Sequence, residues 1–409
     1  MSASSLVKLS ASAVIQDGCI VDGCDLSTLP RTVLQELLLT SISKSRMLCL
    51  RSLITNWPMQ HLVLQNVSSF DEPKAVLLAY CLQRTKYDLK LVDMRGCNIG
   101  LQGTKAFCKL AGNIPVSEND VSGMKILDTC PIEYDSFKEN FSTDFPWKKI
   151  PPLVVMLDCV VDADNCGLAI QACINHSILD LKMSHVTIHP IGRQKVHCLL
   201  SSLEPAIVTG LNLTMNGLQE EGINLISPVL LTLSNLTALN LSYNGITRHN
   251  TTAIQQIANI CGKLPKLRKL DLTGNYIRSG VCSILRHLQS PLTHLALGGC
   301  GARDYDLREM CAMDTVHNLQ SLKLDGNGFV SCIELLCTFV LKSAATLEYL
   351  SLEDNMFDSS SVTLLGQMVS QLPLLKTLSL SYNHLLPDDI RTFTKDFPAL
   401  HLINRDWLY

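Results

Sequence analysis

The residues whose types could support catalysis or metal binding are scattered along the chain and share no catalytic spacing. The 11 histidines form no His-Glu-x-x-His pattern, and neither a Gly-x-Ser-x-Gly nor a Walker-type phosphate loop occurs. The segment Gly298–Gly301 is rich in glycine, but it ends a predicted repeat strand, so we interpret it as a tight turn. Asp304, Asp306 and Glu309 follow it in a polar stretch that a solvated surface explains. We therefore predict no enzyme, no metal site and no cofactor.

The composition excludes several partners. The chain has 409 residues, 47% of them hydrophobic and 17% charged, which is enough apolar material for a large core. Nucleic-acid-binding proteins usually carry an excess of basic residues and aromatic rings that stack on bases. This chain has a net charge of -3 and only 5% aromatic residues. No apolar run approaches the roughly 18 residues of a membrane span. We expect no nucleic acid and no membrane as partners.

Cysteine usage favours a reducing compartment. The 17 cysteines occur singly, without a recurring Cys-x-x-Cys pair, and their odd number cannot close completely into intramolecular disulfides. The stretch Met1–Ile15 lacks the uninterrupted apolar core of a secretion signal. We expect a cytoplasmic protein and leave nuclear residence open, because no run of basic residues stands out.

A repeat dominates the second half of the chain. Seven segments fit the pattern Leu-x-x-Leu-x-Leu-x-x-Asn, with Val at the first place in one and Cys at the last in another. They end at Asn216, Asn244, Asn275, Cys300, Asn327, Asn355 and Asn383. Each predicts a short strand with inward leucines, followed by an asparagine that satisfies backbone groups at the bend. The segments between the strands have apolar residues spaced three and four apart, which predicts helices at Ile223–Leu233, Thr251–Cys261 and Ser361–Leu372.

The repeat predicts an α/β leucine-rich-repeat horseshoe. Parallel strands stack about 4.8 Å apart and helices about 10 Å apart, so the array must bend with its strands inside. Weaker copies precede the clear ones and place the start of the array near residue 60. Their residues are Leu89, Val92 and Met94 leading to Cys97, then Ile178, Leu181 and Met183 leading to Val186.

Four regions follow from this pattern. Residues 1–66 form an N-terminal helical cap, 67–112 the first repeat or repeats, and 150–409 the main repeat domain. Residues 113–149 are polar and acidic and contain three prolines, which predicts a flexible insertion.

Two segments of the cap have the form of docking motifs. Leu6, Ser10 and Val14 are spaced by four and would form one stripe on a helix, suited to a groove in another protein or to packing on the chain's own first repeat. This stripe resembles the elongin C binding box. Leu29, Pro30 and Val33 open a second helical segment that runs to about Ser43, and their pattern resembles the cullin-2 box.

The order of motifs resembles the PRAME family, including leucine-rich repeat-containing protein 14. The segments that carry the resemblance are LVKLSASAVI, LPRTVLQELL and LRSLITNWPMQHLVL, followed by a first repeat, a polar insertion and further repeats. The resemblance implies a substrate receptor of a cullin-2 RING ubiquitin ligase. Leu6, Ser10 and Val14 would contact elongin C within the elongin B/C pair, and Leu29, Pro30 and Val33 would contact cullin-2. We expect Trp57-Pro58 to pack the cap onto the first repeat.

A target protein should bind the concave strand face, through side chains that point away from the core. Tyrosines and charges of both signs at these positions are typical of protein interfaces. The candidates are Asn240, Tyr243, Lys269, Asp271, His294, Lys323, Asp325, Tyr349, Glu353, Ser379 and Tyr382.

Three functions remain open at this point. The first is the ligase substrate receptor, which acts by proximity rather than by chemistry of its own. The second is a stand-alone repeat scaffold that inhibits a signalling or transcriptional partner. The resemblance implies this function because proteins similar to leucine-rich repeat-containing protein 14 are associated with restraint of the NF-κB pathway. The third is a GTPase activator of the Ran-activating type, which shares the repeat architecture.

Overall fold

The computed structural model describes residues 25–83, 89–112, 114–117, 120, 153–175 and 179–405. They belong to two compact units, which we describe separately. Unit 1 extends to Thr187 and includes Ser202–Glu204, and unit 2 comprises Ile188–Ser201 and Pro205–Tyr409. The predicted elongin-binding residues Leu6, Ser10 and Val14 lie outside the described residues, and so does most of the predicted insertion.

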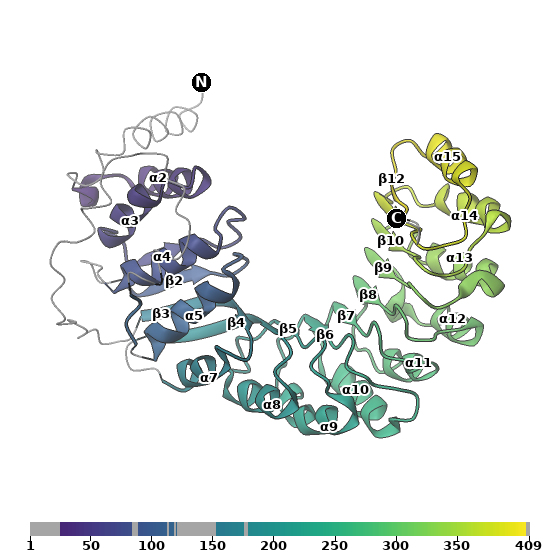
Figure 1. Cartoon of the computed structure of the whole chain (residues 1–409), viewed down its shortest axis with the longest axis horizontal. Helices are drawn as coiled ribbons and strands as arrows, with labels where there is room; N and C mark the ends of the chain where they lie inside the picture. The colour runs from purple at the N-terminus through teal and green to yellow at the C-terminus, as the bar shows by residue number, and fades with distance from the viewer. Residues whose placement is uncertain are drawn as a thin grey trace. The chain divides into compact units, whose positions relative to one another are not determined.

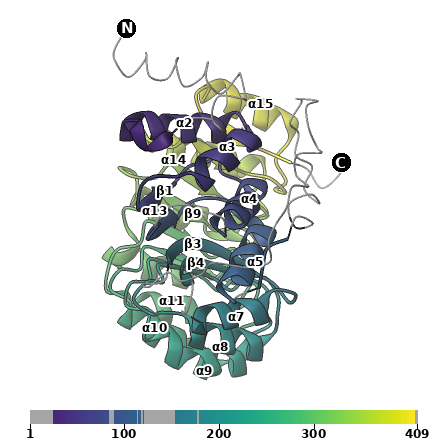
Figure 2. The same cartoon turned by 90° about the vertical axis from the view of Figure 1, so that its left-hand side faces the viewer.

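Unit 1 consists of two cap helices followed by strands and helices in alternation (Figure 2). Its strands are parallel and lie in sequence order; Leu62 of the first pairs with Val92 of the second, which pairs with Val155 of the third. The strands are β1 (His61–Val63), β2 (Leu91–Met94), β3 (Leu153–Val161) and β4 (Leu179–Ile188). The helices are η1 (Leu26–Thr28), α2 (Arg31–Ser43), α3 (Met47–Thr55), α4 (Glu72–Leu82), α5 (Gly100–Ala111) and α7 (Cys166–Ile174).

The helices of unit 1 begin where the local sequence favours it. Helix α2 starts directly after Pro30, whose missing N–H costs nothing at a helix start. Helix α4 has Asp71 as its N-cap, and the carboxylate accepts the backbone N–H of Lys74. Strand β3 alternates strictly between buried and half-buried residues, because neighbouring side chains of a strand point to opposite faces.

Unit 2 repeats one strand and one helical segment, with the strands on the inner side of its arc and the helices on the outer side (Figure 1). Its strands are β5 (Gly210–Asn212), β6 (Ala238–Asn240), β7 (Lys269–Asp271), β8 (His294–Ala296), β9 (Ser321–Lys323), β10 (Tyr349–Ser351), β11 (Thr377–Ser379) and β12 (His401–Ile403). Its α-helices are α8 (Arg193–Ser202), α9 (Gln219–Leu230), α10 (Thr251–Lys263), α11 (Gly280–Leu285), α12 (Asp304–Met310), α13 (Ile333–Leu341), α14 (Val362–Val369) and α15 (Pro387–Asp396). Three 3-10 helices complete it: η3 (Asp314–Val316), η4 (Phe329–Cys332) and η5 (Ser359–Ser361).

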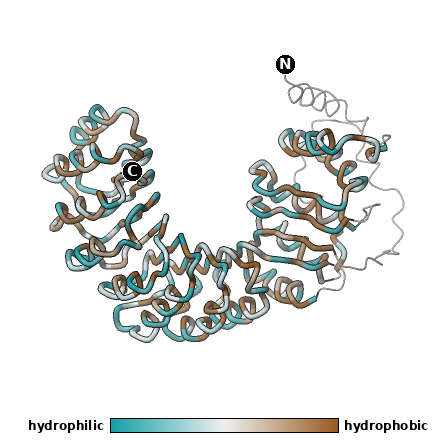
Figure 3. The backbone as a smooth tube through the Cα atoms, turned by 180° about the vertical axis from the view of Figure 1, so that it is seen from behind, coloured by the Kyte–Doolittle hydropathy of each residue, from teal (hydrophilic) through white to brown (hydrophobic). Residues whose placement is uncertain are grey.

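The core of unit 2 lies between strands and helices. The central strand leucines, such as Leu239, Leu270 and Leu322, stack in register on neighbouring strands and are at most 2% exposed. Apolar residues follow the strands and recur along the helices, as Figure 3 shows. Burial of this apolar surface stabilises each repeat only against its neighbours, because no single repeat has a core of its own.

The repeat asparagines form a ladder along one edge of the unit 2 core, and all of them are buried except Asn327, which is half-buried. Asn275 is typical: its side-chain N–H groups donate to the carbonyl oxygens of Leu241 at 2.9 Å and Leu272 at 3.0 Å. Its side-chain oxygen accepts the backbone N–H groups of Asn244 and Ile246, both at 3.1 Å. The asparagine ladder, Asn216, Asn244, Asn275, Asn327, Asn355 and Asn383, therefore ties each strand end to the preceding repeat.

Two cysteines take the place of asparagine in this scheme. The Cys300 thiol donates to the carbonyl of Leu272 at 3.2 Å, and the Cys97 thiol of unit 1 donates to that of Leu64 at 3.0 Å. A thiol donates one weak hydrogen bond and accepts poorly, so these two positions bind the preceding repeat through fewer bonds than an asparagine does.

The predicted α/β leucine-rich-repeat solenoid with parallel strands is confirmed. The first strand of the array begins at His61, near the predicted residue 60, and so lies inside the segment predicted as the cap. The Gly298–Gly301 turn is also confirmed, because Gly299 and Gly301 have φ values of 61° and 71°. Among the residues that the structure describes, no helix has the length and apolar character needed to cross a membrane.

The interpretation of Asp306 as a solvated residue is wrong. Its side chain is only 3% exposed and accepts the backbone N–H of Arg303 at 3.0 Å, which caps α12. The neighbouring Glu309 forms an ion pair with Arg286 of the preceding repeat. Asp306 also accepts a hydrogen bond from the Cys282 thiol of the preceding repeat at 3.4 Å, so both carboxylates join adjacent repeats, a role that the local sequence does not reveal.

Candidate protein-binding surface

The strands of unit 2 turn one face to the core and leave the other open. We call the open side the strand face; it carries the residues before and after the central leucine of each strand and the two that precede the asparagine. Residues at equivalent places lie side by side, because Lys269 pairs with His294 and Asp271 with Ala296 in the parallel register. The strand face thus presents columns of side chains from successive repeats.

Ten of the predicted contact residues reach this face with part of their surface exposed. Tyr243, Lys269 and Lys323 are the most accessible, with Tyr243 55% exposed. The others are partly covered by neighbouring strands: Asn240, Asp271, His294, Asp325, Tyr349, Glu353 and Tyr382. Whether any of them contacts a partner stays a prediction.

Ser379 does not offer a contact surface. Its side chain is fully buried at 0% exposure, and its hydroxyl donates a hydrogen bond to the carboxylate of Glu353 on the adjacent repeat. The small hydroxyl lies below the longer side chains beside it, so Ser379 orients Glu353 and cannot itself touch a partner.

Two carboxylates lie close together on the strand face. Asp325 accepts a hydrogen bond from the Ser351 hydroxyl at 2.5 Å and another from the backbone N–H of Glu353 at 3.0 Å. Burial raises the pKa of the Asp325 carboxyl above its usual value, and the nearby negative charge of Glu353 raises it further. Side-chain and backbone donors therefore hold this carboxylate in a fixed position.

Cationic and aromatic groups share the strand face with the acidic pair. The Lys323 ammonium lies 5.7 Å from the centre of the Tyr349 ring, within range of a cation–π interaction. Burial lowers the pKa of His294, and the positive charge of Lys269 lowers it further. The surface thus combines tyrosines with charges of both signs, which suits a protein partner.

Tyr243 lies where the strand face meets the loops. It has a φ of 54°, and its ring lies against Gly274 of the next repeat, where a Cβ would be only 2.3 Å from Cδ1 of the ring. Glycine at 274 therefore lets an exposed tyrosine pack against the neighbouring backbone. Met215, at the equivalent place one repeat earlier, is 60% exposed and was not predicted; its position before the repeat asparagine was the available signal.

The predicted cullin-binding residues mark the start of α2. Leu29 closes η1 by donating its backbone N–H to Leu26, and Val33 donates its backbone N–H to Pro30 at 2.9 Å. Pro30 is exposed, while Leu29 and Val33 are half-buried. These three residues therefore form a partly accessible apolar corner, whose binding role stays a prediction.

Trp57 has the predicted packing role. Its side chain is 2% exposed, and its ring N–H donates to the carbonyl oxygen of His61 at 3.1 Å, at the start of β1. The indole thus joins the end of the cap helices to the first strand.

Within the described ranges, no group of three or more His, Cys, Asp or Glu side chains is arranged to hold a metal ion.

Comparison with known proteins identifies the repeat region. Residues 227–397 match the PRAME C-terminal domain family. The predicted resemblance to the PRAME family is confirmed over these residues. The PRAME-like repeats coincide with the part of unit 2 that carries the candidate strand-face residues.

Curated relatives of this PRAME-like chain match about half of it. Leucine-rich repeat-containing protein 14 from Bos taurus is 25% identical over 204 residues, which are 48% of this chain and 41% of that protein. The Homo sapiens counterpart is 25% identical over 207 residues, 49% of this chain and 42% of that protein. Protein NLRC5 from Mus musculus is 26% identical over 197 residues, 47% of this chain and 10% of that protein. The matches thus span less than half the length of each relative.

Two solved structures also resemble the chain. The leucine-rich repeat-containing protein LegL7 from Legionella pneumophila has a TM-score of 0.40 at 19% identity and covers 64% of this chain and 86% of its own. A Bacteroides fragilis protein has a TM-score of 0.31 at 14% identity and covers 67% of this chain and 72% of its own.

Proposed function

We propose that this leucine-rich-repeat scaffold is the substrate-recognition subunit of a cullin-2 RING ubiquitin ligase. Its N-terminal segment binds elongin B/C and cullin-2, and the strand face of unit 2 holds the target protein. The observation that carries the proposal is the combination of PRAME-like repeats with a partly accessible apolar corner, formed by Leu29, Pro30 and Val33 at the start of α2. The protein then contributes proximity to a ubiquitin-charged enzyme and needs no active site.

Co-expression with elongins B and C and cullin-2 tests the ligase assembly. The natural chain is expected to co-purify with all three, and Leu6→Ser to lose the elongins, because removing a buried apolar anchor costs about 2 to 4 kcal/mol. Leu386→Ser is the matched control, since Leu386 is 58% exposed far along the chain. If the natural chain binds no elongin, the ligase proposal fails.

The cullin contact is tested separately. Val33→Glu should release cullin-2 and keep elongins B and C, because it places a charge in the apolar corner. Leu39→Glu, on the same helix and 40% exposed, should keep both. Equal loss in the two variants would show that helix α2 was disturbed and that the corner has no specific role.

The target-binding surface is tested with matched tyrosines. Once a target has been captured, Tyr243→Ala is expected to weaken its binding by about 2 kcal/mol, roughly 30-fold, if Tyr243 is an anchor. Tyr305→Ala is the control, because Tyr305 is equally exposed at 55% but lies on α12. Similar losses for both variants would argue against the strand face as the binding surface.

A stand-alone inhibitory scaffold is the second candidate. The family match covers residues 227–397, within the repeats, and does not include the N-terminal segment. In that case the strand face binds and blocks its partner without elongins. Target binding that persists in Leu6→Ser, together with undiminished inhibition of the partner, would favour this function.

A further inference from the structure

Two arginines of consecutive repeats stand at equivalent places on the loops that follow β7 and β8. Arg278 is the third residue after Asn275, and Arg303 is the third residue after Cys300. The corresponding residues of the other five repeat segments are Gln219, Thr247, Val330, Asp358 and Leu386. The pair of positive charges is therefore particular to these two loops.

Tyr276 is held in place beside these arginines. Its ring lies against Gly301 of the next repeat, where a Cβ would be only 2.5 Å from the ring. The Arg278 guanidinium carbon is 4.8 Å from the ring centre, within range of a cation–π interaction. These contacts fix the position of Tyr276, although 45% of its surface is exposed.

Hydrogen-bond donors converge on the Tyr276 hydroxyl. It accepts a hydrogen bond from Nη2 of Arg278 at 2.7 Å, which leaves its own proton available for a further acceptor. The hydrogen bond from Arg278 lowers the pKa of this hydroxyl, and the positive charges of Arg278 and Arg303 lower it further. Nε of Arg278 is buried without a hydrogen-bond partner. Because a guanidinium donates and cannot accept, this group of side chains suits an acceptor that carries negative charge.

The two arginines carry positive charge that the described part of the chain does not pair. Neither Arg278 nor Arg303 forms an ion pair there. The nearby carboxylate of Asp306 is buried and accepts the backbone N–H of Arg303 at 3.0 Å. The guanidinium groups beside Tyr276 are therefore available to a partner.

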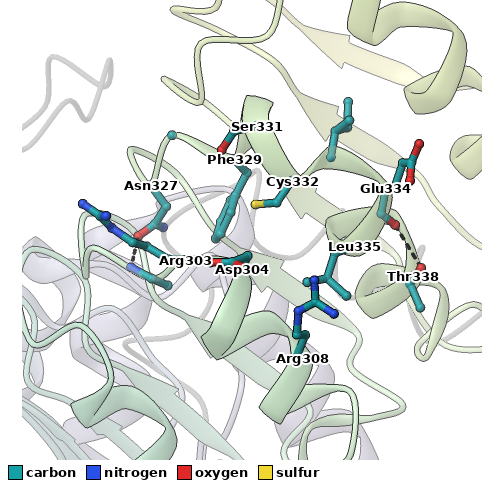
Figure 4. Close-up of a pocket in the computed structure, with 13 residues that line it drawn as sticks. Arg303, Asp304, Arg308, Asn327, Phe329, Ser331, Cys332, Glu334, Leu335 and Thr338 are labelled. Carbon is teal, nitrogen blue, oxygen red and sulfur yellow. Dashed lines mark hydrogen bonds between the residues drawn. The ribbon is translucent and has the colours of Figure 1, made fainter.

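Asp304 lies on the other side of Arg303, at a cavity of about 1040 Å³ between helices α12 and α13. Burial raises the pKa of Cys332 in this cavity, and the negative charge of Asp304 raises it further. The Arg303 side chain extends away from Cys332, as Figure 4 shows. The cavity lining combines Arg303 and Arg308 with Asp304 and Glu334, so the cavity itself favours neither sign of charge.

The surroundings of Tyr276 favour a protein partner. Met215 and Tyr243, after β5 and β6, are 60% and 55% exposed, and methionine, tyrosine and arginine are enriched at protein interfaces. The net charge of -3 provides no extended basic surface for a nucleic acid. Two guanidinium groups beside one hydroxyl suit a single carboxylate or phosphate group, which arginine binds through paired hydrogen bonds.

We infer that Arg278, Arg303 and the Tyr276 hydroxyl form a docking site for one acidic or phosphorylated side chain of a partner protein. The guanidinium groups bind its oxygen atoms, and the Tyr276 hydroxyl donates a further hydrogen bond. The site lies after the repeat motifs, outside both the cap and the strand face, so it does not depend on the proposed ligase function.

Oriented peptide libraries test the site. Three pools of nine-residue peptides, random except for a central glutamate, phosphoserine or lysine, are arrayed and probed with the labelled full chain. The natural chain should bind the glutamate or the phosphoserine pool at least about tenfold more strongly than the lysine pool. The stronger of the two acidic pools then shows whether the partner group is a carboxylate or a phosphate. Equal binding of all three pools would overturn the proposal.

Charge reversal assigns the preference to this site. Arg303→Glu should lose the acidic preference and gain binding to the lysine pool, which a misfolded variant could not show. Arg308→Glu is the matched control and should keep the acidic preference, because Arg308 is an exposed arginine at the other end of α12. An acidic preference that persists in Arg303→Glu would place the binding elsewhere and contradict the site.

The hydroxyl is tested with a single labelled peptide from the preferred pool, measured by fluorescence anisotropy. Tyr276→Phe should weaken its binding by about tenfold, because one hydrogen bond to a charged group is lost. Tyr305→Phe, at a tyrosine that is 55% exposed on α12, should bind normally. Equal affinities of the two variants would remove the hydroxyl from the site. Loss of elongin binding in the natural chain would leave all of these outcomes unchanged.

Discussion

At the scale of single residues, the asparagine ladder and the Asp325–Glu353 pair show two uses of buried polar groups. Asn275 satisfies backbone donors and acceptors of two repeats at once, so its whole hydrogen-bonding capacity is used in holding strands together. Asp325 is also bound by donors, but it carries a charge that burial disfavours. The first group stabilises the fold at every pH, whereas the contribution of the second depends on protonation.

Asn275→Ala should destabilise unit 2 by about 2 to 4 kcal/mol, because it leaves buried backbone groups of two repeats without partners. Urea unfolding followed by circular dichroism measures the change. Asn235→Ala is the control: its side chain also bonds to a carbonyl of the preceding repeat, that of Ala206, but at an exposed position. A loss no larger than that of the control would show that the ladder is not a main source of stability.

Asp325 should make stability depend on acidity. Because its folded pKa is raised, the folded state binds this proton more tightly than the unfolded state does, and its contribution is present below the ordinary value of 3.8. That contribution is lost as the pH rises through the raised pKa. As the pH rises from 3.8 through the raised pKa, Asp325→Asn should therefore lose less stability than the natural chain. Unfolding midpoints at a series of pH values measure the difference. Parallel pH profiles of the two proteins would contradict the assignment.

At the scale of elements, the cap helices and the first strand act as one packed assembly through Trp57. Trp57→Ala should destabilise unit 1 by about 3 to 5 kcal/mol, because it opens a large cavity and removes the hydrogen bond to His61. Leu39→Ala, on the exposed side of α2, should change stability by less than about 1 kcal/mol. Unfolding curves and limited proteolysis of the cap give the measurement, and equal effects would indicate that the tryptophan packs loosely.

The helices of unit 2 differ in length from repeat to repeat. Helices α9 and α10 have 12 and 13 residues, whereas α11 has 6 and α12 has 7. The repeats of unit 2 therefore share their strands more closely than their helices.

At the scale of the whole molecule, cysteines are distributed by burial. Burial raises the pKa of Cys261 and of Cys300 to about 12, so neither thiol ionises near neutral pH. Cys198, on α8, is exposed.

Iodoacetamide at pH 8 should accordingly label Cys198 in the native protein and leave Cys261 and Cys300 unmodified. Peptide mass spectrometry of native and urea-denatured samples measures the pattern, and all three should be labelled after denaturation. Rapid native labelling of Cys261 would show that the repeat core opens readily.

The repeat period, the inward leucines and the Cys97 and Cys300 replacements were all predictable, because each depends on alternation along a strand and on contacts with the adjacent repeat. The strand-face residues were largely predictable for the same reason, since the place of a side chain in the repeat decides which way it points. Ser379 was the exception, because the longer Glu353 side chain of the adjacent repeat covers it.

Tertiary structure decided what depends on comparing repeats in space. The burial of Asp306, the contact of Tyr276 with Gly301 and the cavity between α12 and α13 each join residues of neighbouring repeats whose helices differ in length. A repeating pattern specifies what successive units share. The differences between them acquire a chemical meaning only when the units are stacked, because the burial and contacts of each side chain depend on the neighbouring repeat.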